Sequence, residues 1–497
     1  MKNEIKSTKH LKNKTQESLI WYSTLPLALH FVRFANSIVL ARILLPSDLG
    51  IIGLVSVILY YCDTLTNLGF GSAIIQHKQI SEQHYQSFFS FNLFISIVLF
   101  ITAQYSAEQV AIFFNIPEVE YVLPLYSGLF IISAFAIIPT LKLKRRLEFK
   151  AIAIIDVLKV AISISISLTL ALNGFGFWSI LFASLVSQIV MLILLFIYTG
   201  YTVKLTHDLR PLKELFNFSS WSFVNGQFKL LSDNIDKLLV GKELGAAELG
   251  YYDKAIGLMK MPADQISAKL GSVSFSSFSR FQTDKKNLFS TFKQINLINS
   301  LVMIPIFIGL IWTSEPLIWV LLGEKWMPIV TCMKILGVSY IFLCLSGPKL
   351  TLCLAAGKVK QQTIIRGILT CLLIVNLISL PSYNITTIAI YIAIYNGFSY
   401  VLSLALIATL QQSWTFTIFK DDLIAVIPSI LMCIGIYMFE KVFGIQEYVP
   451  LLIWDIIIGT TCYAVCIMLL PSPQYQIFSR AIRQFSIKKK RIQNDGK

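Results

Sequence analysis

Polar and charged side chains recur at helical spacing inside an apolar stretch near the start of the chain. Four of them share one face of a helix at this spacing: His30, Arg33, Asn36 and Ser37. Charged groups are costly in an apolar environment, so they face a hydrated cavity or a partner. Arg33 has no acidic neighbour three or four positions away on its own helix. We therefore predict that Arg33 contacts an anionic group of a substrate.

A second polar stripe follows 200 positions later, where Arg33 corresponds to Asp233 and Asn36 to Asp236. The same region and the segments after it carry further charges, among them Lys229, Lys237, Lys260, Asp264 and Lys293, and Asp63 lies in an earlier segment. An alternative interpretation is internal pairing, since Asp233–Lys237 and Lys260–Asp264 are each four positions apart and can form ion pairs along a helix.

The basic members of this set suit a phosphate or pyrophosphate group, because Arg offers a bidentate fork and Lys a mobile point charge. We expect Arg33, Lys229, Lys260 and Lys293 to bind such a headgroup. Coupling of transport to a proton or sodium ion through an acidic group is also an open alternative, and the unranked candidates for that group are Asp63, Asp233, Asp236 and Asp264. The other residues expected to line the cavity are His30, Asn36 and Lys237. The histidines and cysteines show no metal-ligand spacing and the expected outer loops carry no catalytic cluster, so we expect no enzyme activity, metal or cofactor.

Composition identifies the elements that must position these residues. Of the 497 residues, 55% are apolar and 14% are charged, whereas soluble domains average about 45–50% and 25%. About 20 apolar residues cross the hydrocarbon core of a bilayer as a helix. The repeated apolar stretches therefore predict an all-α integral membrane protein with about 14 transmembrane helices. The expected spans are 19–43, 48–70, 86–107, 119–140, 151–172, 176–200, 214–240, 246–276, 289–313, 327–346, 363–380, 386–409, 422–439 and 449–470. The seventh and eighth are the least apolar.

The distribution of the 42 Lys and Arg residues predicts the orientation of these helices. With the N-terminus inside, the outer loops hold only Lys242, Lys325 and Lys441, and most of the others outside the spans fall in inner segments. Such asymmetry follows the positive-inside rule, so both termini are expected in the cytoplasm. The basic tail then lies beside anionic lipid, and we expect no nucleic-acid binding.

An internal repeat predicts the arrangement of the helices. LARILLPSDLGII at 40–52 aligns without a gap with VGKELGAAELGYY at 240–252, so that Gly50 matches Gly250. The two copies begin at spans one and seven; an even separation makes them parallel copies, related by an axis along the membrane normal. The predicted organisation is a basic N-terminus (1–18), an N-lobe of six helices (19–200), a cytoplasmic linker (201–213), a C-lobe of six helices (214–409), helices 13–14 (410–470) and a basic tail (471–497).

The motif LARILLPSDLG at 40–50, followed by LGFGSAIIQ at 68–76, resembles the N-terminal signature of polysaccharide-transport flippases. The stretch DKLLVGKELGAAELGYYDKAIGLMKMPADQI at 236–266 and SFSRFQTD at 277–284 are similar to the same family. This family belongs to the multidrug, oligosaccharidyl-lipid and polysaccharide exporter superfamily. The chain departs from many relatives at Asn67, where they carry an acidic residue, and near Ser276, where they carry a proline.

The resemblance implies a Wzx-type flippase that moves an undecaprenyl-pyrophosphate-linked oligosaccharide across the bacterial inner membrane for O-antigen, capsule or exopolysaccharide synthesis. It also implies alternating access through a V-shaped cavity between two lobes, with Arg33 facing that cavity. Expected partners are the lipid-linked oligosaccharide, the bilayer, a coupling H+ or Na+, and a polysaccharide polymerase. The alternatives are a multidrug or organic-cation antiporter and a lipid II flippase of the same superfamily. A polysaccharide polymerase or ligase is disfavoured, because those usually need a large outer loop.

Overall fold

The structure is a computed structural model that describes residues 25–68, 70–77, 80–281, 284–411 and 416–469. Within these ranges the chain is helical and contains no strand. It divides into two compact units, residues 1–253 and 254–497, and each unit is described by itself. The expected basic termini, 1–18 and 471–497, lie outside the described residues.

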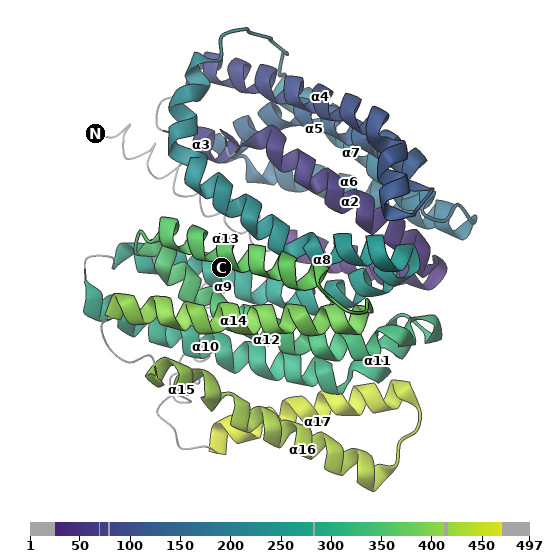
Figure 1. Ribbon diagram of the computed structural model, residues 1–497, viewed down its shortest axis with the longest axis vertical. Helices are drawn as coiled ribbons and strands as arrows, with labels where there is room; N and C mark the ends of the chain where they lie inside the picture. The colour runs from purple at the N-terminus through teal and green to yellow at the C-terminus, as the bar shows by residue number, and fades with distance from the viewer. Residues whose placement is uncertain (1–24, 69, 78–79, 282–283, 412–415, 470–497) are drawn as a thin grey trace, which may run out of the picture. The chain divides into compact units, whose positions relative to one another are not determined.

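Apolar helices of membrane-spanning length make up most of the first unit (Figure 1). Its helices are Leu25–Ile43, α2 (Pro46–Asn67), α3 (Phe70–Gln76), α4 (Glu82–Phe114), α5 (Val119–Arg145), α6 (Phe149–Leu172), α7 (Trp178–Thr199) and the first part of α8 (Arg210–Pro262). The start of α2 follows from its sequence, because Pro46 occupies the first turn and the Asp48 carboxylate accepts the Leu45 N–H at 3.0 Å. Left-handed residues at Asn115 and Gly200 end α4 and α7.

The second unit continues from α8 through a short π-helical turn into a further set of helices. The π-helix is Ala263–Ser267, followed by α9 (Ala268–Arg280), α10 (Lys285–Trp312), α11 (Ser314–Leu321), a 3₁₀ helix (Glu324–Ile329), α12 (Val330–Ala355), α13 (Val359–Ile378), α14 (Ile385–Gln411), α15 (Phe416–Ile424), α16 (Val426–Phe443) and α17 (Tyr448–Leu469). Helix α12 packs between α10 and α14, and α16 packs against α17 (Figure 1).

Twelve helices among the described residues are long and apolar enough to cross a membrane. They coincide with every predicted span except the seventh and eighth, so the predicted count of fourteen is not confirmed. The sequence of those two spans lies mainly in α8, which carries too many charges to qualify as an apolar span. Helix α8 is two helices joined at Gly245, whose φ of 82° and ψ of −177° are non-helical. The predicted eighth span, 246–276, is interrupted after Pro262 by the π-helix.

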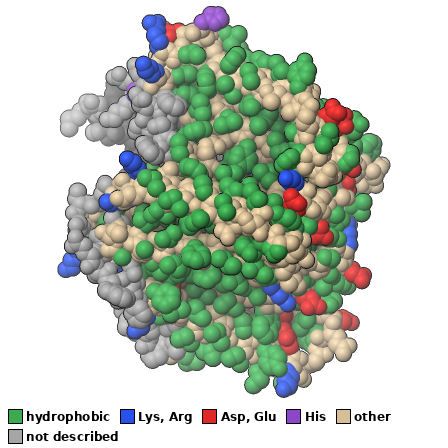
Figure 2. Space-filling view, viewed as in Figure 1, with side chains coloured by type: hydrophobic (Ala, Val, Ile, Leu, Met, Phe, Trp, Pro, Cys, Tyr) green, Lys and Arg blue, Asp and Glu red, His purple; other side chains and the backbone are tan. Residues whose placement is uncertain are grey.

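Hydrophobic side chains cover most of the face shown in Figure 2, with few Lys, Arg, Asp or Glu side chains among them. Many large apolar residues are exposed, including Phe94 at 64% and Tyr105 at 81%. A water-soluble protein rarely exposes apolar surface on this scale, whereas a bilayer solvates it. The structure is therefore that of a multi-pass membrane protein. The predicted lobe boundaries at 19–200 and 214–409 remain a prediction.

Candidate functional site

The predicted polar stripe on the first helix, Leu25–Ile43, lies partly on the surface of the first unit. His30 and Arg33 are exposed, whereas Asn36 is half-buried. The Nδ2 atom of Asn36 donates to the Ser167 hydroxyl on α6 at 3.5 Å, and its Oδ1 atom is buried without a hydrogen-bond partner. An exposed arginine within an apolar helix requires water, a lipid headgroup or an anionic ligand beside it.

Arg33 has an acidic neighbour that its own helix does not reveal. Asp156 on α6 lies within electrostatic range of Arg33 and of Lys159, one turn further along α6. The Lys159 ammonium donates a hydrogen bond to Gln188 Oε1 on α7. We call Arg33, Asn36, Asp156, Lys159 and Gln188 the Arg33 cluster. It contains two cations and one carboxylate, so it retains a net positive charge that can bind an anion.

The second polar stripe occupies the first part of α8, where it contains both exposed and buried side chains. Asp233, the counterpart of Arg33, is exposed, and so is Lys229. Asp236, the counterpart of Asn36, is 4% exposed. Its carboxylate accepts the Tyr252 hydroxyl and the Lys237 backbone N–H, both at 2.8 Å. The two stripes agree in exposure at Arg33 and Asp233 but not throughout, since His30 is exposed and its counterpart Leu230 is buried. That both stripes line one cavity remains a prediction.

Lys237 forms an ion pair that spacing along one helix does not reveal. Its ammonium lies 2.5 Å from Asp253, which is 16 positions further along the chain beyond the bend at Gly245. Asp233, its partner in the alternative interpretation of internal pairing, is one turn earlier on the same helix and within electrostatic range of Lys237. The bend folds the two parts of α8 back on each other, and this brings residues 16 apart into contact. Together with the Asp236–Tyr252 hydrogen bond, the pair joins the two parts of α8.

Asp63 on α2 is half-buried in the first unit, beside a polar contact with α8. The Gln227 amide of α8 donates to the Thr64 hydroxyl at 3.2 Å. The nearby Tyr61 hydroxyl is buried without a hydrogen-bond partner, within electrostatic range of Asp233 and Asp236. These groups bring one of the candidate acids, Asp233, close to α2.

The remaining predicted residues lie in the second unit and are not drawn together there. Lys260, Asp264 and Lys293 are all exposed. Both members of the expected Lys260–Asp264 pair are described, yet no ion pair joins them. Asp264 belongs to the π-helical turn, whose wider winding changes the angular spacing of residues four apart. Lys293 instead lies within electrostatic range of Asp421 on α15.

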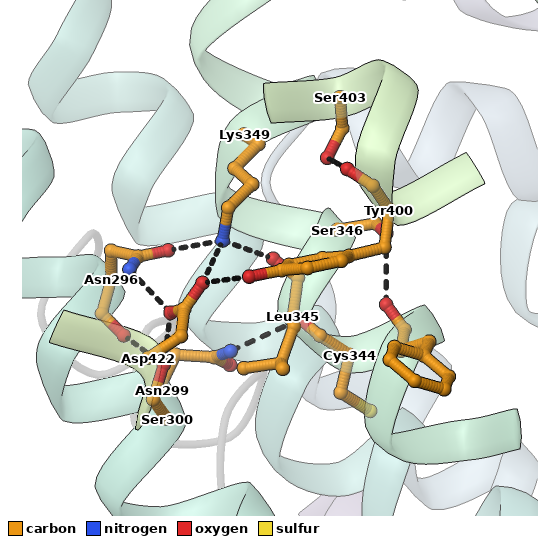
Figure 3. Close-up of polar contacts among 11 residues, drawn as sticks. Asn296, Asn299, Ser300, Cys344, Leu345, Ser346, Lys349, Tyr400, Ser403 and Asp422 are labelled. Atoms are coloured by element: carbon orange, nitrogen blue, oxygen red, sulfur yellow. Dashed lines mark hydrogen bonds and ion pairs between the residues drawn. The ribbon is translucent and has the colours of Figure 1, made fainter. Parts of the chain in front are cut away.

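The most deeply buried ion pair of the second unit joins two residues outside the predicted set (Figure 3). Lys349 on α12 is 0% exposed and Asp422 on α15 is 3% exposed. The Lys349 ammonium donates to Asp422 Oδ2 at 2.9 Å, to Asn296 Oδ1 at 2.9 Å and to the Leu345 carbonyl at 2.8 Å. All three ammonium hydrogens therefore have acceptors.

The Asp422 carboxylate is satisfied from three sides as well. Its Oδ1 atom accepts the Asn296 amide and the Ser300 hydroxyl, each at 2.7 Å, and its Oδ2 atom also accepts the Tyr400 hydroxyl at 2.7 Å. We call Asn296, Ser300, Lys349, Tyr400 and Asp422 the Lys349 network. It joins α10, α12, α14 and α15, and its two charges compensate each other. Lys349 lies between the predicted spans 327–346 and 363–380, and sequence spacing gives no sign of a partner 73 positions away.

A second buried carboxyl group is present on α17. Asp455 is 2% exposed, and its Oδ1 atom has no hydrogen-bond partner. Glu440 on α16 lies within electrostatic range and accepts the Trp312 indole N–H at 2.9 Å. Nothing in the sequence around Asp455 marks it, since no other charge lies three or four positions away. Among the described residues, no three His, Cys, Asp or Glu side chains gather in a way that could hold a metal ion.

Comparison with known sequences shows which protein family this chain resembles. A sequence model for a family described as polysaccharide biosynthesis protein matches residues 39–331, more than half of the chain. The teichuronic acid biosynthesis protein TuaB of Bacillus subtilis is 23% identical over 60% of this chain and 62% of TuaB. The lipopolysaccharide biosynthesis protein WzxC of Escherichia coli is 24% identical over 70% of this chain and 71% of WzxC. The chain thus spans less than two thirds of TuaB.

Solved structures identify the fold. The lipid II flippase MurJ in an inward closed conformation superposes with a TM-score of 0.73 at 16% identity, over 92% of this chain and 99% of that chain. An inward-facing multidrug resistance transporter of the MATE family gives a TM-score of 0.61 at 14% identity, over 81% and 99%. These likenesses show a shared helical transporter fold. They confirm the all-α fold expected from the sequence.

Proposed function

Because the chain belongs to the polysaccharide biosynthesis protein family, we propose that it is a flippase for an undecaprenyl-pyrophosphate-linked oligosaccharide. It moves this lipid across the bacterial inner membrane by alternating access, for the synthesis of a surface polysaccharide. The names of the relatives support a surface polymer as the end product, since TuaB and WzxC are biosynthesis proteins for teichuronic acid and lipopolysaccharide.

The observation that carries this proposal is the Arg33 cluster. An exposed guanidinium, that of Arg33, lies in an apolar helix, with Lys159 and the Asp156 carboxylate in electrostatic range. A pyrophosphate supplies the negative charge that the cluster lacks, and its oxygens match the bidentate fork of arginine. A cation substrate would be repelled by the same net charge, which disfavours an organic-cation antiporter.

The physical course of transport follows from the chemistry of the substrate. The pyrophosphate binds at Arg33 while the prenyl chain stays in lipid, so only the polar headgroup and sugars cross the hydrocarbon core. The basic termini remain in the cytoplasm, and the delivered oligosaccharide passes to a polysaccharide polymerase. A proton or sodium ion bound at an acidic group drives the cycle, with Asp63, Asp233, Asp236 and Asp264 as candidates.

Substitution of Arg33 tests the headgroup site. In a deletion strain complemented with Arg33→Ala, we expect surface polysaccharide to fall at least about tenfold, because hydrogen bonds to charged groups contribute roughly 1.5–3 kcal/mol. Mass spectrometry of lipid extracts should show the undecaprenyl-pyrophosphate oligosaccharide accumulating. Immunoblotting of membranes should show normal protein levels.

Arg146→Ala provides the matched control, since Arg146 is an exposed arginine just beyond the end of α5. It should restore surface polysaccharide to the wild-type level. Full restoration by Arg33→Ala would reject Arg33 as a headgroup residue. A deletion strain with an unchanged surface and no lipid-linked intermediate would reject the flippase itself and favour small-molecule export.

A further inference from the structure

The two copies of the internal repeat touch each other at their matching glycines. A Cβ atom added to Gly50 on α2 would lie 1.8 Å from the carbonyl oxygen of Ala246 on α8. A Cβ atom added to Gly250 would lie 1.8 Å from the carbonyl oxygen of Pro46. Because 50 and 250 correspond in the repeat, and 46 and 246 also correspond, the two contacts are the same contact made twice. The backbones of the two helices therefore meet across a local two-fold axis.

The symmetry continues one turn further along both helices. Gly53 faces Asp253, its own counterpart in the repeat, and a Cβ atom added to Gly53 would lie 3.9 Å from the Asp253 Cβ. We call the contact made by Pro46, Gly50 and Gly53 with Ala246, Gly250 and Asp253 the glycine crossing. Small residues at such positions let helix backbones approach closely in membranes. A crossing this close leaves no space between the helices for water or for a lipid-linked sugar.

The glycine crossing lies at one end of its helices. Pro46 is the first residue of α2, and Ala246 directly follows the bend of α8 at Gly245. In the orientation that the charge distribution predicts, both starting points are at the outer surface of the membrane. A contact on the two-fold axis at one end of a transporter closes that end, and it must separate when the two repeats rock apart there.

We propose that the glycine crossing is the outer gate of the transporter, closed in this structure and opened when the substrate leaves. This proposal rests on the proposed flippase function. It gives the paired motifs a role: glycine is required at 50 and 250 because the backbones of the two helices touch at these positions, where a Cβ atom would overlap a carbonyl group.

A reversible cross-link tests whether the crossing must open. The 3.9 Å separation at Gly53 and Asp253 falls within the Cβ–Cβ range of disulfides, about 3.5–4.5 Å. Gly53→Cys and Asp253→Cys are combined in a chain whose eight native cysteines are replaced by serine. Oxidation should form the disulfide and reduce surface polysaccharide in proportion to the cross-linked fraction, and dithiothreitol should restore it. Undiminished export by the cross-linked protein would show a permanent contact and overturn the proposal.

Each single cysteine variant is the control for the pair, and Asp253→Cys also measures the loss of the Lys237–Asp253 ion pair. A second experiment leaves that ion pair intact. The cysteine-free chain carrying only Gly53→Cys is treated from outside with a membrane-impermeant maleimide, and the rate at which its thiol is labelled is measured. Adding Gly50→Ala should force the crossing apart and accelerate labelling, because the new methyl group overlaps the Ala246 carbonyl.

Gly128→Ala is the matched substitution, since a Cβ atom there meets no atom within 4 Å. It should leave the labelling rate of the Gly53→Cys thiol unchanged. Equal labelling in the Gly50→Ala and Gly128→Ala backgrounds would contradict a gate at this position. Labelling and cross-linking need no substrate, so they report on the gate even if the deletion strain accumulates no lipid-linked oligosaccharide.

Discussion

At the scale of single residues, the charges of this protein divide by burial. Arg33, Lys229, Lys260 and Lys293 are exposed, so their side chains are accessible to a ligand. In the Lys349 network, by contrast, the ammonium and carboxylate are enclosed and fully hydrogen-bonded. An enclosed and compensated pair has no capacity left for a substrate, so we assign it to holding α15 against the rest of its unit.

Removing one partner of this pair should destabilise the protein strongly. Lys349→Met leaves the Asp422 carboxylate buried without its cation, and breaking such a pair typically costs about 3–5 kcal/mol. The double variant Lys349→Met with Asp422→Asn removes both charges, and it should recover most of the lost stability. The free energy of unfolding is measured in detergent micelles, with circular dichroism as the readout of unfolding.

Lys286→Met is the control, because Lys286 is exposed at the start of α10. Exposed substitutions usually change stability by less than about 0.5 kcal/mol. If Lys349→Met were as stable as this control, the Lys349 network would have no structural role.

At the scale of elements, α8 determines how the second polar stripe is presented. Its bend at Gly245 returns the chain on itself, so that Lys237 meets Asp253 and Asp236 meets Tyr252. The bend needs a backbone conformation with φ of 82° and ψ of −177°, which is essentially restricted to glycine. The contacts of Lys237 and Asp236 in this stripe therefore depend on Gly245, which has no side chain.

Gly245→Ala should destabilise the protein, because an alanine at these dihedral angles costs about 1–3 kcal/mol. Thermal unfolding in detergent should show a lower midpoint than the wild type. Gly257→Ala lies in the same α8 within a helical stretch, where a Cβ atom meets nothing within 4 Å, and should not lower the midpoint. Equal midpoints for the two variants would mean that the bend tolerates a side chain.

Helices formed by long apolar stretches were predictable from the sequence. Stretches such as 149–172 are apolar throughout, and their extent alone sets where the helix lies. Helix α8 was harder to assign as two spans, since its many charges mask the apolar signal. The π-helical turn at Ala263–Ser267 was not predictable either, because Pro262 indicates an interruption without specifying its winding.

The candidate site was predictable only within single helices. Helical spacing predicted that His30 and Arg33 share one face of their helix, and both are exposed, while the cavity they were expected to face remains a prediction. It could not bring Asp156 to Arg33 or Asp422 to Lys349, since these partners lie on other helices far along the chain. The repeat correctly aligned Gly50 with Gly250, but alignment carries no sign that the two residues touch. Contacts between helices depend on packing, which spacing along one helix does not encode.

At the scale of the whole molecule, charge asymmetry predicts which end of the glycine crossing faces outward. A cysteine at Glu118, between α4 and α5, should react with a membrane-impermeant maleimide in intact cells. A cysteine at Arg146, beyond the other end of α5, should react only after the membrane is permeabilised. The reverse pattern would place both termini outside and would turn the proposed outer gate into an inner one.

The proposed function requires the protein to move a lipid-linked oligosaccharide from the inner to the outer leaflet. The most direct measurement is the reaction of that oligosaccharide with periodate, which does not cross the membrane, in intact and lysed spheroplasts of the deletion strain. We expect the oligosaccharide to react only after lysis, and to become reactive in intact spheroplasts when the wild-type protein is restored. Oligosaccharide that already reacts in intact spheroplasts without the protein would contradict the proposed function.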